Sequence, residues 1–260
     1  MNNANIETEV IVSNDNITSN SSNISQNQNE INELTLAFVS MVAHEFRSPL
    51  TTIQSSTEIL ESFSDRLSKE EKEKHFQTVY ESISNLAGLL DDVIMFYRTD
   101  TKTIKPKHEK FDIISFSKKI IEEIKNTFSE TPQINFYPKI EELNVTSDKK
   151  LFSQIFSNLV SNAIKYTPLN QNVDVSIARL NGNAIFEVRD YGIGIPENER
   201  CKIFNPFFRA RNTKGITGSG LGLAIVQKSV NVLEGKISFL SDEKRGTMFT
   251  VTIPVNGGEQ

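Results

Sequence analysis

Four short clusters contain residue types that could do chemistry, and the first is built on His44. It lies in the stretch His-Glu-Phe-Arg-Ser-Pro-Leu at residues 44–50, inside a segment whose apolar residues recur every three or four positions. A helical step of about 100° per residue places His44 roughly 140° from the apolar direction, so we expect its imidazole to face solvent. A lone histidine on a helix is more often an ordinary surface residue. Pro49 predicts a bend beside His44, although it would also fit a tolerated kink.

The second cluster places two amides and an amine on one helix. Asn158 and Asn162 are four residues apart and therefore share a helical face, and Lys165 follows them. Asparagine is a mediocre helix former, so this face indicates polar ligation. Amide oxygens suit a hard cation, and an amine suits phosphate. The alternative is a solvated helix face without a ligand.

The third cluster, Asp190-Tyr-Gly192-Ile-Gly194, follows a predicted strand. Its glycines permit a turn in which backbone passes close to a ligand. The Asp190 carboxylate could accept a hydrogen bond from an exocyclic amine such as that of adenine. Hairpin turns use the same residues, so this cluster alone is weak evidence.

The fourth cluster, Gly218-Ser-Gly220-Leu-Gly222, opens a predicted helix whose free N–H groups could hold phosphate. Between it and the third cluster lies an aromatic run at residues 203–209, in which phenylalanines are more often packing residues than ligand contacts. The sequence contains no G-x-x-x-x-G-K-[ST] motif, which excludes a P-loop. The glycines also lack the early βαβ context of a dinucleotide-binding fold.

Two helices must position His44. An apolar stripe runs through residues 31–60, and a second stripe with steps of three and four covers residues 76–97 after a polar turn. The two helices predict an antiparallel hairpin whose seam is half covered. A second copy of the chain would complete a four-helix bundle, so we expect a homodimer.

A separate α/β domain must position the other clusters. Helices are expected at about 112–128, at 149–166 behind an Asp148 cap, and at about 220–233. Alternating apolar residues predict strands at 133–137, 173–180, 184–189, 236–240 and 248–254. The expected fold class is a helical hairpin followed by an α/β sandwich with helices on one sheet face. The predicted parts are a disordered Asn/Ser-rich tail (1–29), the hairpin (30–99), a hinge (100–110) and the second domain (111–256).

Composition excludes several classes of protein. The 260 residues carry a formal net charge of −5, which disfavours nonspecific binding to nucleic acid. One cysteine and three scattered histidines offer neither a disulfide nor zinc-ligand spacing. No apolar run approaches the roughly 20 residues of a membrane helix, so we expect a cytoplasmic protein without membrane insertion.

Taken in order, the clusters resemble the conserved boxes of the sensor histidine kinases over roughly residues 31–255. The resemblance implies a dimeric hairpin joined to a Bergerat ATP-binding domain that uses ATP and Mg²⁺. It implies His44 as phosphoacceptor, Glu45 as general base, and an aspartate on the receiver domain of a response regulator as the final acceptor. Asn162 would be the principal Mg²⁺ ligand with Asn158 assisting, and Asp190 would read adenine. The other implied ATP contacts are Lys165, Tyr166, Gly192, Gly194, Phe204, Phe208, Arg209, Gly218, Gly220, Leu221 and Gly222.

Two departures from this resemblance and two rival functions remain open. The first departure is that we expect no sensor domain before the hairpin, so the resemblance does not identify an input signal. Ser48 stands where the family usually has Thr or Asn for dephosphorylating the partner, which predicts weak phosphatase activity. A related serine kinase of the anti-sigma type would share the ATP domain but would leave the histidine helix without a purpose. A catalytically inactive dimerisation scaffold would bind no ATP.

Overall fold

The structure is a computed structural model that describes residues 15–100, 105–128, 130–216 and 218–255, with the backbone alone for residues 15–38 and 97–100. The chain divides into two compact units, residues 1–48 and 49–260. Within the described ranges, no helix combines the length and the apolar character needed to cross a bilayer. In the first unit the structure describes the N-terminal part of helix α1, Asp15–Phe63, whose remaining residues belong to the second unit.

Helix α1 begins earlier than the sequence predicts. Residues 15–29, expected to belong to a disordered tail, are helical, whereas residues 1–14 lie outside the described residues. Once a helix has nucleated, each added residue contributes one hydrogen bond, so a polar segment can extend an amphipathic helix without a core of its own. The helix continues through Pro49. The predicted boundary at residue 29 therefore does not mark the start of the helix.

The turn of the predicted hairpin is closed by a capping box. Ser68 precedes helix α2, and its backbone N–H donates to the Glu71 carboxylate at 2.8 Å while the Glu71 N–H donates to the Ser68 hydroxyl at 3.2 Å. Along α2 the side chains of Phe76, Ile83 and Leu90, spaced seven apart, are exposed. The structure confirms the helical hairpin. Its turn contains the short helix η1, Ser64–Arg66, and α2 spans Lys69–Asp100.

A small two-stranded sheet follows the hairpin and was not predicted. Strand β1, His108–Asp112, begins inside the predicted hinge and pairs antiparallel with β3, Asn144–Asp148. Each strand has five residues, which is too short for alternation to stand out from a polar loop. The predicted hinge therefore ends before β1, and its residues 101–104 lie outside the described residues.

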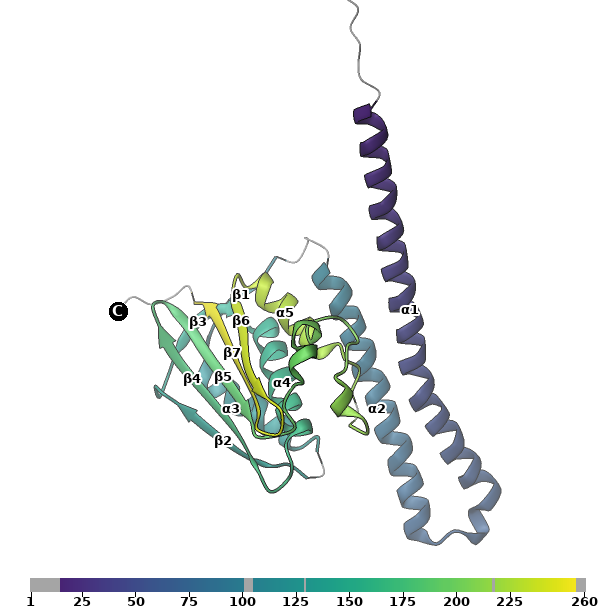
Figure 1. Cartoon of the computed structure of the whole chain (residues 1–260). Coiled ribbons are helices and arrows are strands. Elements are labelled where there is room, and N and C mark those ends of the chain that lie inside the picture. Colours follow the sequence, from purple (N-terminus) through teal and green to yellow (C-terminus); the bar gives the residue numbers. More distant parts are fainter. Residues whose placement is uncertain (1–14, 101–104, 129, 217, 256–260) are drawn as a thin grey trace, which may run out of the picture. The chain divides into compact units, whose positions relative to one another are not determined.

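The main sheet has the strand order β2-β4-β5-β7-β6, in which β2 is parallel to β4 and the other neighbours are antiparallel. The helices that follow the hairpin cover one face of it (Figure 1). This arrangement confirms the predicted sandwich. The strands are β2 Gln133–Pro138, β4 Asn172–Leu180, β5 Asn183–Asp190, β6 Lys236–Asp242 and β7 Gly246–Pro254; the helices are α3 Ile113–Lys125, α4 Lys149–Tyr166 and α5 Gly222–Val232.

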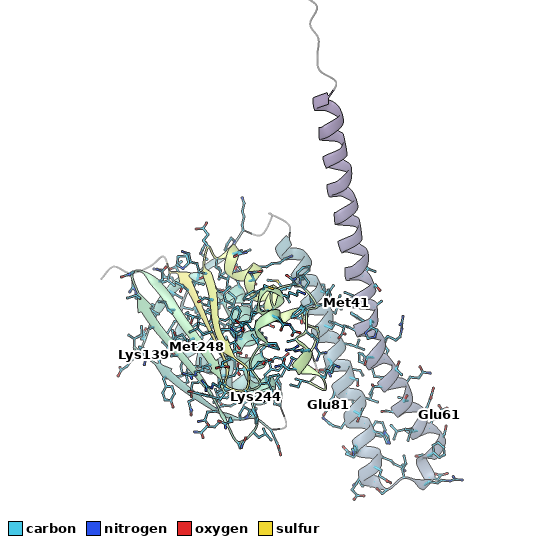
Figure 2. All side chains as sticks on the ribbon, in the orientation of Figure 1. Met41, Glu61, Glu81, Lys139, Lys244 and Met248 are labelled. Carbon is cyan, nitrogen blue, oxygen red and sulfur yellow. The ribbon has the colours of Figure 1, made fainter. Side chains whose placement is uncertain are left out.

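Aromatic packing between α4 and the sheet forms the centre of the core. The rings of Phe152 and Phe156 lie 5.5 Å apart, and both contact Phe186 of β5, at 5.5 and 5.8 Å. All three side chains are fully buried. Figure 2 draws the side chains that fill this layer, with Met248 marking β7. Asp148 caps α4, as predicted, by accepting from the Leu151 N–H at 2.9 Å.

Phe186→Ala should test this aromatic centre. Because the ring is fully buried among other rings, its loss should lower the free energy of unfolding by about 3–5 kcal/mol. Tyr137→Ala is the matched control, because Tyr137 is a strand aromatic with 54% exposure and its loss should change stability by less than about 1 kcal/mol. Urea unfolding followed by circular dichroism measures both. Equal losses in the two variants would contradict the assigned core.

Candidate functional site

The polar face of α4 borders two adjoining pockets. Leu159 and Ala163 on this helix pack into the core, which turns Asn158, Asn162 and Lys165 toward the space between α4 and the loops that follow β5. Two pockets lie there and share Asn162, Tyr166, Ile203, Phe208, Arg209 and Leu223. The predicted face of α4 is therefore a pocket wall rather than a solvated surface.

The first pocket, here called the ring pocket, is mainly apolar and has one buried carboxylate. Asp190, at the end of β5, is 7% exposed, and its Oδ1 accepts from the Gly192 N–H at 3.0 Å. Burial raises the pKa of Asp190 to about 6, and hydrogen bonds from the Gly192 and Thr247 N–H groups partly offset this effect. Such a pocket suits a flat apolar ring that carries an N–H donor. Its other lining residues include Leu159, Ala163, Val188, Ile193, Gly194, Ile195, Ala210, Thr213 and Phe249.

Gly192 holds the turn after Asp190 against the end of α4. A Cβ at this position would lie 1.9 Å from the Tyr166 carbonyl oxygen, so only glycine fits. The next residue, Ile193, donates its N–H to the same carbonyl at 3.3 Å. This contact places the carboxylate and the α4 side chains on the same pocket.

The second pocket, here called the anion pocket, gathers positive charge. It is lined by Lys165, Arg209 and the residues before α5, including Gly218, Ser219, Gly220 and Gly222. Within the described residues, no side chain caps α5, whereas Asp112 and Asp148 cap α3 and α4. The N–H groups of the first turn of α5 are therefore available to an anion.

The two cations of the anion pocket are held differently. Burial lowers the pKa of Lys165; attraction to Asp92 opposes this effect and repulsion from Arg209 adds to it. Arg209 donates from Nη2 to the carbonyls of Thr213 and Ile216, which fixes its guanidinium in the loop before α5. Both groups suit the oxygen atoms of a phosphate chain.

Asn158 and Asn162 supply hard oxygen atoms for a divalent cation. The Asn158 amide nitrogen donates to the Gln154 carbonyl at 2.9 Å, so its oxygen points toward α5. There a Cβ at Gly222 would approach that oxygen to 2.7 Å, and glycine leaves the space open. The described residues contain no group of three acidic, His or Cys side chains that could hold a metal. The donor set therefore fits Mg²⁺ only if ligand phosphates and water complete the coordination.

His44 lies in the first unit, on α1, and its side chain is 77% exposed, as predicted. Its Nδ1 is 3.8 Å from Oε1 of Glu45, whose side chain is 31% exposed. This distance is longer than a hydrogen bond, but a change of side-chain rotamer can close it. Ser48 lies one turn later and is also exposed.

Three predicted contact residues do not line either pocket. Phe204 packs edge-on against Phe239 with ring centres 6.0 Å apart, Leu221 is completely buried, and Gly192 shapes the turn described above. Phe204 and Leu221 thus serve the core, which is the usual role of apolar residues. The remaining predicted ATP contacts line the ring pocket, the anion pocket or both.

Sequence reasoning missed several polar residues of the site, and Asp92 and Thr247 are the two that bear most on its charge and hydrogen bonding. Asp92, on α2, lines the anion pocket, and Thr247, on β7, lines the ring pocket. Nothing in the sequence pattern singles out Asp92, because Asp91 precedes it and charged residues are common on an exposed helix. For Thr247 the sequence did offer a signal, because it stands between Gly246, which permits a turn, and the predicted strand at 248–254.

Two parts of the chain match known families. Residues 147–257 match the family described as histidine kinase-, DNA gyrase B-, and HSP90-like ATPase, and residues 35–102 match the His Kinase A (phospho-acceptor) domain. The sensor histidine kinase YvrG of Bacillus subtilis (strain 168) is 29% identical over 245 residues, which are 94% of this chain and 42% of YvrG. The chain spans 42%, 49% and 17% of three of the curated relatives that it matches.

Solved structures share the fold. The histidine kinase AdeS of Acinetobacter baumannii aligns with a TM-score of 0.62 and 22% identity, covering 82% of this chain and 98% of that one. The histidine kinase ThkA, in complex with the response regulator protein TrrA, aligns with a TM-score of 0.65 and 24% identity, covering 90% and 66%. At these identities the likeness establishes the fold alone.

Asp190→Asn should stabilise the folded chain at neutral pH. Folding raises the pKa of this carboxyl from 3.8 to about 6. Its ionisation therefore lowers the free energy of unfolding as pH rises from 3.8, and the loss is complete above about pH 6. Asparagine keeps an acceptor for the Gly192 N–H without the charge, and we expect a gain of ~2 kcal/mol at about pH 7.5. The gain should shrink as pH falls below about 6 and vanish near pH 4, where both states are protonated.

Urea unfolding at several pH values measures this difference. Glu141→Gln, which removes a charge from an exposed side chain, is the control and should show no such pH dependence. A gain for Asp190→Asn that is independent of pH would contradict the assigned burial of the ionised carboxylate.

Proposed function

Since this chain belongs to the sensor histidine kinase family, we propose that it is the catalytic core of such a kinase, which uses Mg-ATP to phosphorylate its own His44 and passes the phosphoryl group to a response regulator. One observation carries the proposal. An exposed histidine beside a carboxylate occurs in the same chain as a pocket with a buried acceptor at one end and cations at the other.

The residues of the ring pocket would select and orient adenine. Asp190 would accept from the exocyclic amine, and the apolar walls would enclose the ring. A ligand without an N–H donor for Asp190 would bind poorly, because the buried carboxylate would keep only its hydrogen bonds from the Gly192 and Thr247 N–H groups. This arrangement supports a purine nucleotide as the substrate.

The residues of the anion pocket would orient the phosphate chain. Lys165, Arg209 and the N–H groups at the start of α5 would neutralise its charge. Asn162, assisted by Asn158, would hold Mg²⁺ together with the phosphates, and the metal would supply further charge neutralisation. A ring nitrogen of His44 would bond to the terminal phosphorus as the bond from that phosphorus to the bridging oxygen breaks and ADP leaves, while Glu45 would accept the proton of the other ring nitrogen.

Incubation of the full chain with Mg²⁺ and ATP labelled in the γ-phosphate tests this reaction. We expect a label that is labile in acid and stable in alkali, and its complete loss in His44→Gln. His75→Gln is the matched control because His75 lies on the other helix of the hairpin and should keep the label. Label that persists in His44→Gln would rule out His44 as the acceptor.

The same experiment separates the two rival functions. A serine kinase related to this family would give acid-stable phosphate on a partner protein. An inactive scaffold would bind no ATP at all, which direct titration of the native chain would reveal. Neither rival explains the exposed His44 beside Glu45.

We also propose that the chain is a homodimer. The apolar side chains of Phe76, Ile83 and Leu90 recur every seven residues on α2 and are about half exposed in the single chain. A stripe of this spacing is the seam of a helical bundle, and a second copy would bury it. The predicted four-helix bundle would then be complete.

Leu90→Asp should break this dimer. A carboxylate buried in an apolar seam without a partner costs several kcal/mol. Asn85→Asp introduces the same side chain at another exposed position of α2 and should leave the dimer intact. Light scattering after size exclusion should give about twice the chain mass of 29.3 kDa for the native protein and for Asn85→Asp, and one chain mass for Leu90→Asp. A native monomer would refute the dimer.

The proposed partner is the receiver domain of a response regulator, in the cytoplasm where ATP is available. The complex of ThkA with TrrA supports this class of partner, because its fold resembles that of the present chain. Ser48, one turn after His44, would face a docked receiver and orient water for dephosphorylation. Without a branch at Cβ, serine holds such an orientation less firmly than threonine, which supports weak phosphatase activity.

A further inference from the structure

One face of α2 packs against the ATP-binding domain, inside the second compact unit. Leu89 and Phe96 are buried although the apolar side chains of the exposed stripe on the same helix are not. Asp92 lies between them, three residues after Leu89 and four before Phe96, so all three share one helical face. This face is distinct from the stripe of Phe76, Ile83 and Leu90.

Lys228 of α5 holds the buried face in place. Its ammonium lies 3.4 Å from the centre of the Phe96 ring and donates to the Phe96 carbonyl at 3.3 Å. The contact joins the last part of α2 to the helix whose first turn borders the anion pocket. Asp92, one helical turn before Phe96, is thereby directed at that pocket.

The Asp92 carboxylate lies among hydrogen-bond donors and cations that could also bind the phosphate of a ligand. Its Oδ2 accepts from the Ser219 hydroxyl at 3.3 Å, within the loop that opens α5. It is also attracted to Lys165, and it lines the anion pocket together with Asn158, Asn162 and Arg209. Burial raises the pKa of Asp92 to about 6, while Ser219 and Lys165 favour the ionised form, so the group is a carboxylate above that pH.

A carboxylate in this place opposes a phosphate chain. It uses Ser219 and Lys165, which an anionic ligand would otherwise engage, and it adds a negative charge inside a partly desolvated pocket. Coulomb repulsion between anions is stronger in such surroundings than in bulk water, and it grows with the charge of the ligand. Asp92 would not repel adenosine, because adenosine carries no phosphate.

We propose that Asp92 is an internal competitor of the nucleotide phosphates, so that α2 docked against α5 lowers the affinity for ATP and bound ATP releases this contact. The inference rests on the proposed function, because it concerns the same pocket. Through this contact the hairpin would regulate the binding of ATP. Any movement of α2 that withdraws Asp92 from the anion pocket raises the affinity for ATP. By reciprocity, bound ATP shifts the equilibrium toward undocked α2 by the same factor by which undocking raises the affinity.

Calorimetric titration of the full chain with adenosine, ADP and ATP, in the presence of Mg²⁺ at about pH 8, tests the proposal. Asp92→Asn should bind ATP about tenfold more tightly than the native chain, ADP by a smaller factor, and adenosine equally well. Asp91→Asn is the matched control, because it removes the same charge from the adjacent exposed residue. It should behave as the native chain.

Three results would overturn the proposal. Weaker binding of Mg-ATP to Asp92→Asn would make Asp92 a metal ligand instead of a competitor. Equal ATP affinities for the Asp92 and Asp91 variants would mean that the carboxylate does not oppose the phosphates. A similar gain for adenosine would indicate a general change of the pocket. A native chain that binds none of the three ligands would instead refute the proposed function, and the inference with it.

Discussion

The packing of α4 against the sheet is the constraint on which the rest of the site depends. Phe152 and Phe156 lock one side of the helix onto Phe186, and the helical period then determines where every other side chain points. Asn158, Asn162 and Lys165 line a pocket because their helix cannot rotate. The aromatic core thus determines the directions in which the polar side chains of α4 point, and the loops contribute little to this orientation.

The site also contains charged and polar groups in places where they lower the stability of the folded protein. Asp190 is a buried carboxylate that the surrounding apolar walls disfavour, and partial burial lowers the pKa of the Lys165 amine, which lies near another cation. The start of α5 leaves N–H groups uncapped although the two other helices of the layer are capped by aspartate. Each of these three arrangements lowers the stability of the ligand-free protein. A purine nucleotide would offset all three costs, because its N–H donor would pair with Asp190 and its phosphates with Lys165 and the N–H groups of α5.

Much of this architecture could be predicted because it depends on local patterns. The alternation along β4, β5 and β7 and the Asp148 cap follow directly from the sequence, and so does the common face of Asn158 and Asn162. Asp92 could not be found, since its role depends on a contact with Ser219, 127 residues away along the chain. The burial of the Leu221 side chain could not be predicted either, because a motif records that a residue belongs to a loop but not which way its side chain points.

The position of β7 bears on how the site comes into being during synthesis. Although it follows β6 in the chain, β7 lies between β5 and β6 in the sheet and pairs with both. It also supplies Thr247 and Phe249 to the ring pocket. A nascent chain that has not yet released β7 from the ribosome therefore has neither the complete sheet nor the complete wall of the ring pocket. The ring pocket can therefore form only after the whole of β7, Gly246–Pro254, has been synthesised and has left the ribosome.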